Sequence, residues 1–291
     1  VGGDQVHLGT NALAAQTTAN LLPTQAVDTI AIGNGAIEKA TLGFAQNKSV
    51  SGAIAIGSAA MNEITGTTGA THTNVIAIGT NAMEKLGLQT NSGNIAIGNG
   101  AMRNLAGDSF HPQNGCIAIG EDAMSVFTHV RNGTIQNVAI GNQAFQTPGN
   151  AGNVGSDVVA VGFQAALENC ESGCVAIGSN AGSGTTFGLN LRSVAIGFQA
   201  AEEGNDNGGN TVAIGYRAAR NGAGASSIAI GRQAGENNQL GDNSIAIGKE
   251  AAGSPDTRKN STIVINATGT DLNSSGDNAL HIATLGSTAQ G

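Results

Sequence analysis

The hydrophobic positions of this chain follow one seven-residue motif: aliphatic, Ala, aliphatic, Gly, two variable residues, and Ala. Residues 95–101, Ile-Ala-Ile-Gly-Asn-Gly-Ala, are one copy. Further copies occupy 30–36, 54–60, 76–82, 117–123, 138–144, 159–165, 175–181, 194–200, 212–218, 228–234 and 245–251. Self-similarity at about 20 residues predicts stacked supersecondary units, each stabilised by its neighbours.

Side chains alternate between the two faces of a strand, so the two aliphatic residues of each motif share one face and the Ala between them lies on the other. The Gly that follows permits the positive φ or the close approach that a corner needs. Each motif therefore predicts a short strand ended by a turn. We expect the aliphatic pairs to fill the inside of a narrow coil, with the alanines forming a flat outer wall against which sister chains pack.

These features predict an all-β fold, a parallel β-roll or β-solenoid of about thirteen or fourteen coils. We expect a degenerate first repeat and cap over residues 1–29, where His7 replaces the central Ala, and a repeat domain over 30–253. Residues 254–291 are expected to form a terminal strand and a polar exit segment. Because the chain begins at Val1 without an initiator Met, we expect a fragment or a processed product.

Two properties of the repeat change near Gly162. Successive motif glycines are 24, 24, 22, 19, 22, 21 and 21 residues apart up to Gly162, then 16, 19, 18, 16 and 17 apart up to Gly248. The residue after the last Ala of the motif is large in the first half (Leu13, Ile37, Met61, Met83, Met102, Met124, Phe145) and small in the second (Ala166, Gly182, Ala201, Ala219, Gly235, Ala252). We infer that the longer coils need a larger filler at this position.

The composition agrees with a thin solenoid and disfavours two classes of partner. The chain has 45 Gly, no Trp and only 3% aromatic residues, whereas a thick globular core usually contains more rings. The net charge of -8 and the absence of basic clusters argue against nucleic acid. No run of 18 apolar residues occurs, so membrane insertion is not expected.

Candidate chemistry is sparse, and we predict no catalytic, cofactor-binding or metal-binding residue and no enzymatic activity. The histidines are scattered (His7, His72, His111, His129, His281), and Glu121-Asp122 and Glu202-Glu203 are adjacent pairs whose side chains diverge in extended chain. Cys116 and Cys174 precede a motif where other repeats carry a small polar residue, so we interpret them as members of a small-residue column. Cys170 and Cys174 lack the second half of a zinc ligand set. Phe163, Phe198 and Tyr216 follow motif glycines, where we expect them to cap a corner or pack against a neighbouring subunit in preference to stacking on a ligand.

The motif resembles the repeat of the left-handed parallel β-roll in the heads of YadA-like trimeric autotransporter adhesins, over roughly residues 6–267. Residues 260–273, Asn-Ser-Thr-Ile-Val-Ile-Asn-Ala-Thr-Gly-Thr-Asp-Leu-Asn, resemble the segment that closes such rolls in fibre and spike proteins of large algal viruses and marine phages. In those proteins an endosialidase-type intramolecular chaperone often follows. The resemblance implies a homotrimer.

The function implied is a non-enzymatic structural and adhesive module of a trimeric viral fibre, spike or tail fibre on the virion surface. Its partners would be two further copies, other fibre or virion proteins, and a host cell-surface glycan or protein. The alternatives are the head of a bacterial trimeric autotransporter adhesin, extracellular on the cell surface, and a glycan-degrading tailspike. The loop segments 38–53, 62–74, 103–115 and 125–137 are equally candidates for receptor contact and for covering the sides of the roll or interlocking subunits.

Overall fold

A computed structural model describes residues 4–13, 26–41, 49–65, 71–86, 91–105, 114–125, 136–146, 155–168, 170–184, 192–203, 209–237, 240–252, 259–268, 272 and 276–283. The described part is all-β and forms a parallel β-solenoid, with no helix among these residues. The chain divides into two compact units, residues 1–157 and 158–291. The division falls close to the point at which the motif spacing shortens.

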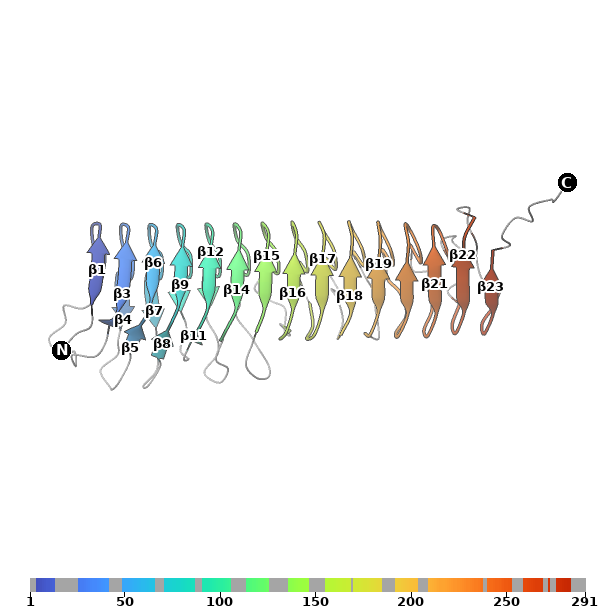
Figure 1. Ribbon diagram of the computed structural model, residues 1–291, viewed down its shortest axis with the longest axis horizontal. Coiled ribbons are helices and arrows are strands. Elements are labelled where there is room, and N and C mark those ends of the chain that lie inside the picture. The colour runs from blue at the N-terminus through green and yellow to red at the C-terminus, as the bar shows by residue number, and fades with distance from the viewer. Residues whose placement is uncertain are drawn as a thin grey trace. The chain divides into compact units, whose positions relative to one another are not determined.

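In the first unit, each motif contributes one strand of a parallel sheet whose strands follow sequence order (Figure 1). The strands are β1 (Gln5–Leu8), β3 (Thr29–Ile32), β6 (Ile54–Ile56), β9 (Ile76–Ile78), β12 (Ile95–Ile97), β14 (Ile117–Ile119) and β15 (Val138–Ile140). The register places identical motif positions opposite one another, for example Ala96 between Ala77 and Ala118. Residues at the same position of successive motifs therefore lie beside one another and form columns of like side chains.

The longer coils of the first unit carry two additional parallel sheets of short strands. One contains β4 (Lys39–Thr41), β7 (Glu63–Thr65), β10 (Lys85–Leu86) and β13 (Asn104–Leu105). The other contains β2 (Ala26–Val27), β5 (Ser49–Ser51), β8 (Thr71–Thr73) and β11 (Asn91–Ser92). The extra residues per coil in this half thus include further strands beside the motif strand.

The second unit has one sheet of motif strands among its described residues, again in sequence order. Its strands are β16 (Val159–Val161), β17 (Val175–Ile177), β18 (Val194–Ile196), β19 (Val212–Ile214), β20 (Ile228–Ile230), β21 (Ile245–Gly248), β22 (Ile263–Asn266) and β23 (Leu280–Ile282). β23 lies in the expected exit segment and pairs with β22 in register, His281 opposite Val264. The central Ala is thus replaced by His in both the first strand, at His7, and the last.

The corner after each strand depends on the motif Gly. Gly197 has a φ of 130°, and a Cβ built on it would lie 2.4 Å from the carbonyl oxygen of Gly215 in the next coil. The same close approach recurs from coil to coil, as at Gly98 and Gly120. At these glycines, successive coils can therefore stack at strand spacing only because the position carries no side chain.

The expected orientation of the motif strands is wrong: the alanines lie inside the coil and the aliphatic residues lie outside. The central alanines have no exposed surface, for example Ala96, Ala195 and Ala213 at 0%. Their aliphatic neighbours remain partly exposed, with Ile97 at 36% and Ile119 at 37%. The physical reason is width, because facing sheets separated by full aliphatic side chains lie about 10 Å apart, and alanine lets the opposite wall of the coil come closer.

The opposite wall carries the filler residues, and their expected role is confirmed. Met61, Met83, Met102, Met124 and Phe145 are fully buried in the long coils. In the short coils Ala166 and Ala219 are buried at the same position, with 0% and 1% exposed. At this position Gly235 would place a Cβ 3.6 Å from the Cβ of Ala229, the central Ala of its own coil. The filler therefore packs directly against the alanine wall.

Replacing a filler tests this interior. Met102→Ala is expected to lower stability by roughly 2–5 kcal/mol, because it leaves a cavity against the alanine wall. Met102→Leu is expected to cost less than about 1.5 kcal/mol, since it conserves volume and Leu13 already occupies the equivalent position at a φ of 55°. Thermal or denaturant unfolding followed by circular dichroism measures the difference. Equal loss in both variants would contradict the assignment of Met102 to the core.

Candidate interaction surface

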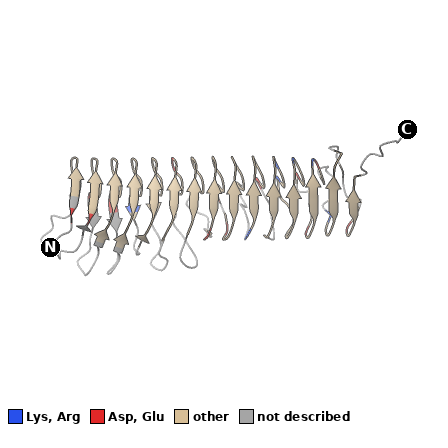
Figure 2. Cartoon of the chain, viewed as in Figure 1, with Lys and Arg blue, Asp and Glu red and all other residues tan. Residues whose placement is uncertain are grey.

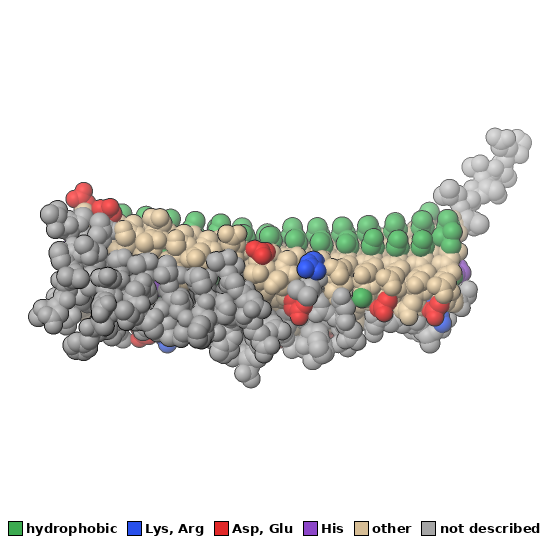
Figure 3. Space-filling view, turned by 90° about the horizontal axis from the view of Figure 1, so that it is seen from below, with side chains coloured by type: hydrophobic (Ala, Val, Ile, Leu, Met, Phe, Trp, Pro, Cys, Tyr) green, Lys and Arg blue, Asp and Glu red, His purple; other side chains and the backbone are tan. Residues whose placement is uncertain are grey.

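The outward aliphatic residues form what we call the aliphatic face: the two aliphatic residues that flank the central residue of each motif strand. In the second unit it consists of Val159, Val161, Val175, Ile177, Val194, Ile196, Val212, Ile214, Ile228, Ile230, Ile245, Ile247, Ile263, Ile265, Leu280 and Ile282. Figure 3 shows these side chains of the second unit as two adjoining apolar rows. The first unit repeats the arrangement from Val6 to Ile140.

Each side chain on this face is shielded from solvent only by the equivalent side chains of the two adjacent strands. Ile177 and Ile247 keep 38% of their surface exposed even with a neighbour on each side. At the terminal strands, where one neighbour is lacking, exposure rises to 61% for Leu8 and 63% for Leu280. The motif strands from β3 to β21 contain no charged residue, and charges lie at the turns, at the connections and on the short side strands β4, β7 and β10 (Figure 2). The face is therefore a long apolar surface without polar interruption within each unit.

Beside this face in the second unit runs a column of residues that directly follow the motif Gly. It contains Phe163, Ser179, Phe198, Tyr216, Arg232 and Lys249. Phe163, Phe198 and Tyr216 are 47%, 44% and 41% exposed. The Phe198 and Tyr216 rings stack with centroids 5.6 Å apart, and the Arg217 guanidinium lies 5.1 Å from the Tyr216 centroid. The three aromatic residues thus lie at a corner, and Phe198 and Tyr216 stack along the column.

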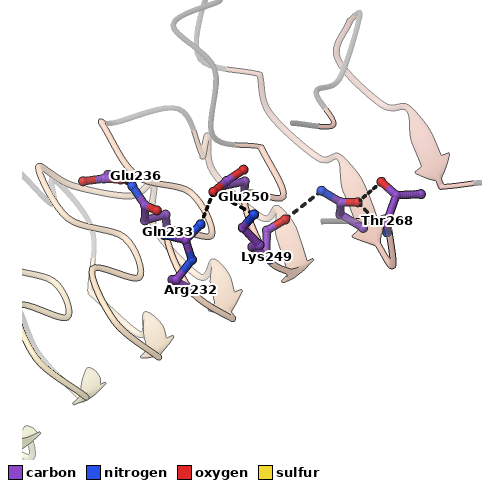
Figure 4. A network of polar contacts seen from close by, with 7 residues as sticks. Arg232, Gln233, Glu236, Lys249, Glu250 and Thr268 are labelled. Carbon is purple, nitrogen blue, oxygen red and sulfur yellow. Dashed lines mark hydrogen bonds and ion pairs between the residues drawn. The ribbon is translucent and has the colours of Figure 1, made fainter. Parts of the chain in front are cut away.

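Toward the end of the second unit this corner carries a polar network (Figure 4). Arg232 pairs with Glu250, and the Lys249 ammonium lies 3.4 Å from the same carboxylate. The Asn266 side-chain amide donates to the Lys249 carbonyl oxygen at 2.7 Å. Partly exposed ion pairs of this kind contribute little stability individually. Their geometric effect is to connect the turns of successive coils.

The inward column before each strand confirms the interpretation of Cys116 and Cys174. Both are buried at the position that Asn94, Ser193 and Thr211 occupy in other coils. The Asn94 side-chain oxygen accepts a hydrogen bond from the Cys116 backbone N–H at 2.9 Å. Burial raises the pKa of the Cys116 thiol to about 11, against a smaller opposing effect of a backbone hydrogen bond from Asn137. Cys116 is therefore a neutral packing residue at neutral pH.

The scattered polar candidates do not converge in the described part of the chain. His7 and His281 lie on terminal strands of different units, and His72 is buried beside Asn91, with 3.4 Å between its Nδ1 and the amide nitrogen. His111 and His129 fall outside the described residues. Among described residues, no group of three or more His, Cys, Asp or Glu side chains is placed to hold a metal ion.

The two acidic pairs lie in turns and not in extended chain as expected, since Asp122 and Glu203 have φ values of 51° and 54°. Glu121 is exposed, whereas Asp122 is half-buried and bonded to Arg103 of the preceding coil. Of the second pair, Glu203 is exposed. The central parts of the four candidate loops, residues 42–48, 66–70, 106–113 and 126–135, lie outside the described residues.

Sequence reasoning did not identify the aliphatic face as the outward surface, although the alternation of residues indicated that its members lie on one side of each strand.

Within the described residues, no helix is long and apolar enough to cross a membrane. No protein-family model, curated protein or solved structure matches the chain.

Proposed function

We propose that this chain is a non-enzymatic structural and adhesive module of a homotrimeric viral fibre, spike or tail fibre. The roll would be left-handed, and its turns and loops would contact the host surface. The observation that carries the proposal is the aliphatic face, which runs through every motif strand of both units and is open in the single chain.

The energetics of that face favour association. Burying one aliphatic side chain completely is worth roughly 1.5–3 kcal/mol. The most exposed isoleucines of inner strands, such as Ile119, Ile177 and Ile230, keep 36–38% of their surface exposed, and each offers roughly 0.5–1 kcal/mol on contact with a partner. Summed over many strands, the gain exceeds the cost of losing rotational and translational freedom. Apolar patches of such extent are rare on monomeric proteins and mark interaction sites.

A second copy of the chain is the occupant that the repeat fits best. A partner with the same strand spacing can interdigitate its rows along the whole length of a unit, whereas an unrelated surface would match only locally. Three narrow rolls around one axis would bury all their aliphatic faces. The number three itself rests on the resemblance to adhesin heads.

Light scattering coupled to size exclusion tests the assembly. We expect a mass three times that of the 28.6 kDa chain, stable on dilution to low micromolar concentration. A folded monomer would contradict the proposal, and a stable dimer would overturn the trimer.

The adhesive role is tested by binding of the labelled assembly to a glycan array and to intact cells. Absence of binding to both would restrict the proposal to a structural role.

A further inference from the structure

Three aromatic side chains lie exposed at the corner of the second unit, in the column of residues that directly follow the motif Gly. Phe163, Phe198 and Tyr216 keep 41–47% of their surface exposed, more than Ile177 or Ile247 on the aliphatic face beside them. Rings at a corner therefore remain largely open in the single chain, and large apolar surface of this kind marks a binding surface.

The fold does not require a ring at this corner position. Ser179 occupies it one coil after Phe163. In the first unit the position holds Thr10, Asn34, Ser58, Thr80, Asn99, Glu121 and Asn142, all of them polar. The corner closes equally well with these short or polar side chains, so the rings of the second unit serve something other than the stacking of the coils.

Backbone hydrogen bonds place the members of the column on successive coils. The carbonyl oxygens of Phe163, Ser179 and Phe198 each accept a hydrogen bond from a backbone N–H of the next coil, at 2.9, 3.0 and 2.9 Å. Neighbouring members are thus separated by the strand spacing of about 4.8 Å, and Phe163 and Phe198 by about 9.6 Å.

The two faces of the Phe198 ring have different surroundings. One face stacks on Tyr216, with 5.6 Å between the ring centroids and 10° between the ring planes. The other is directed along the column toward Ser179, whose side chain is much shorter than a ring. A group held between two rings needs about 7–8 Å, since each van der Waals contact takes about 3.5–4.0 Å. The interval between Phe163 and Phe198 is therefore wide enough for one ring-shaped group above Ser179.

A row of polar side chains runs directly beside the rings, formed by the residue that follows each member of the column. The row consists of Gln164, Asn180, Gln199 and Arg217. The Arg217 Nε donates to the Gln199 Oε1 at 2.9 Å, and the guanidinium lies 5.1 Å from the Tyr216 centroid. Because arginine only donates, this bond uses the Gln199 oxygen and not its amide nitrogen. The Ser179 hydroxyl donates to the Asn180 Oδ1 at 3.0 Å. Hydrogen-bonding groups thus lie within reach of a ligand on the rings.

We propose that this corner binds a pyranose ring of a neutral or acidic glycan, an inference that rests on the adhesive role proposed above. The C–H face of a pyranose carries a weak positive potential and packs against the negative face of an aromatic ring, here Phe198 and Phe163. Its hydroxyl groups pair with the amides of Asn180 and Gln199 and with Arg217. A purely apolar partner would leave these polar groups unpaired, which is costly. The single charge of the polar row, on Arg217, disfavours a cationic sugar.

The single tyrosine makes the corner directly observable. The chain has one Tyr and no Trp, so its tyrosine fluorescence reports on Tyr216 alone. The full-chain assembly is screened on an array of oligosaccharides that contain glucose, galactose, mannose, N-acetylhexosamines, sialic acid or uronic acids. Each glycan that binds is then titrated in solution while the fluorescence is followed. We expect a saturable change in Tyr216 emission at the same concentrations at which the glycan binds.

Two substitutions that the fold already tolerates test the assignment. Phe198→Ser is expected to weaken binding at least tenfold without changing the mass of the assembly, because Ser179 occupies the same corner position. Gln199→Ala is expected to weaken binding severalfold, and Ala59 holds the equivalent position at a φ of 54°. Asn34→Ser, at an exposed corner position of the first unit, is the matched control and should bind as the wild type does.

Three results would overturn the inference. A wild-type assembly that binds no glycan of the array, or a Phe198→Ser variant that binds as well as the wild type, would show that the corner is not a glycan site. Loss of the three-chain mass in Phe198→Ser would show that the rings contact a partner copy instead. Light scattering of the wild type separates these failures from failure of the proposed function, because a three-chain mass keeps its structural part whether or not a glycan binds.

Discussion

Ile230→Asp is expected to convert the assembly into monomers while leaving the coil folded. Ile230 lies in the outer row of the aliphatic face between Ile214 and Ile247, with 36% of its surface exposed. In the single chain a carboxylate at this position remains hydrated. In the assembly it would be enclosed by the aliphatic rows of its neighbours, and an unpaired buried charge costs several kcal/mol in each copy.

The measurement is light scattering across a dilution series, with circular dichroism to verify the fold. We expect the mass to fall from three chains to one at low micromolar concentration, a loss of affinity of at least a hundredfold. Asn237→Asp is a matched control: it adds the same charge seven residues later, at an exposed position with a φ of 65°. Its new carboxylate can still accept the 3.0 Å hydrogen bond that Asn221 donates.

Two outcomes would contradict this view of the face. An assembly that survives Ile230→Asp would show that partner chains do not cover this row. An unfolded Ile230→Asp monomer, alongside a folded control, would mean that Ile230 belongs to the interior of the coil. Partial dissociation limited to high dilution would still support the face, with a smaller contribution from this strand.

Gly197→Ala is expected to abolish stacking at its corner, with a loss of more than about 3 kcal/mol, because two costs coincide there. The φ of 130° is a conformation that only glycine adopts readily. The added Cβ would also lie 2.4 Å from the Gly215 oxygen and 2.8 Å from its carbonyl carbon. Relief requires separating two coils, which breaks the Gly215 N–H bond to the Ile196 oxygen at 2.8 Å.

Two further glycines separate these costs. Gly115 has a φ of 70° and nothing within 4 Å of a built Cβ, so Gly115→Ala should cost about 1 kcal/mol from the backbone alone. Gly276 has open space and no positive φ, so Gly276→Ala should change stability by less than about 1 kcal/mol. Thermal unfolding of the three variants should rank them in this order. Similar midpoints for Gly197→Ala and Gly276→Ala would refute the close-approach argument.

Several elements of the fold follow from local pattern alone. Alternation in Ile-Ala-Ile, followed by Gly, is enough to place a strand and its corner, and the recurrence of the motif is enough to align Ala77, Ala96 and Ala118. The large residue at Met83 or Met102 was identifiable as a core filler because it varies with coil length. The last strand, β23, was missed, although Leu280-His281-Ile282 has the same form as Val6-His7-Leu8 in the first.

The short strands of the two side sheets, β2, β4, β5, β7, β8, β10, β11 and β13, could not be located from sequence. They are two or three residues long, and pairs such as Lys85–Leu86 or Asn104–Leu105 carry no periodic signal. Their existence depends on stacking against the equivalent residues of the next coil.

The sequence by itself determined that the isoleucines and the alanines of each motif lie on opposite faces, that each strand ends at a glycine corner, and that like residues form columns. It did not determine which face is the inside. That depended on how wide the closed coil is, a property of the whole turn and its opposite wall. The coil closes with buried Met102 or Ala219 facing the strand, a gap that admits alanine and excludes isoleucine, so the larger side chains lie outside.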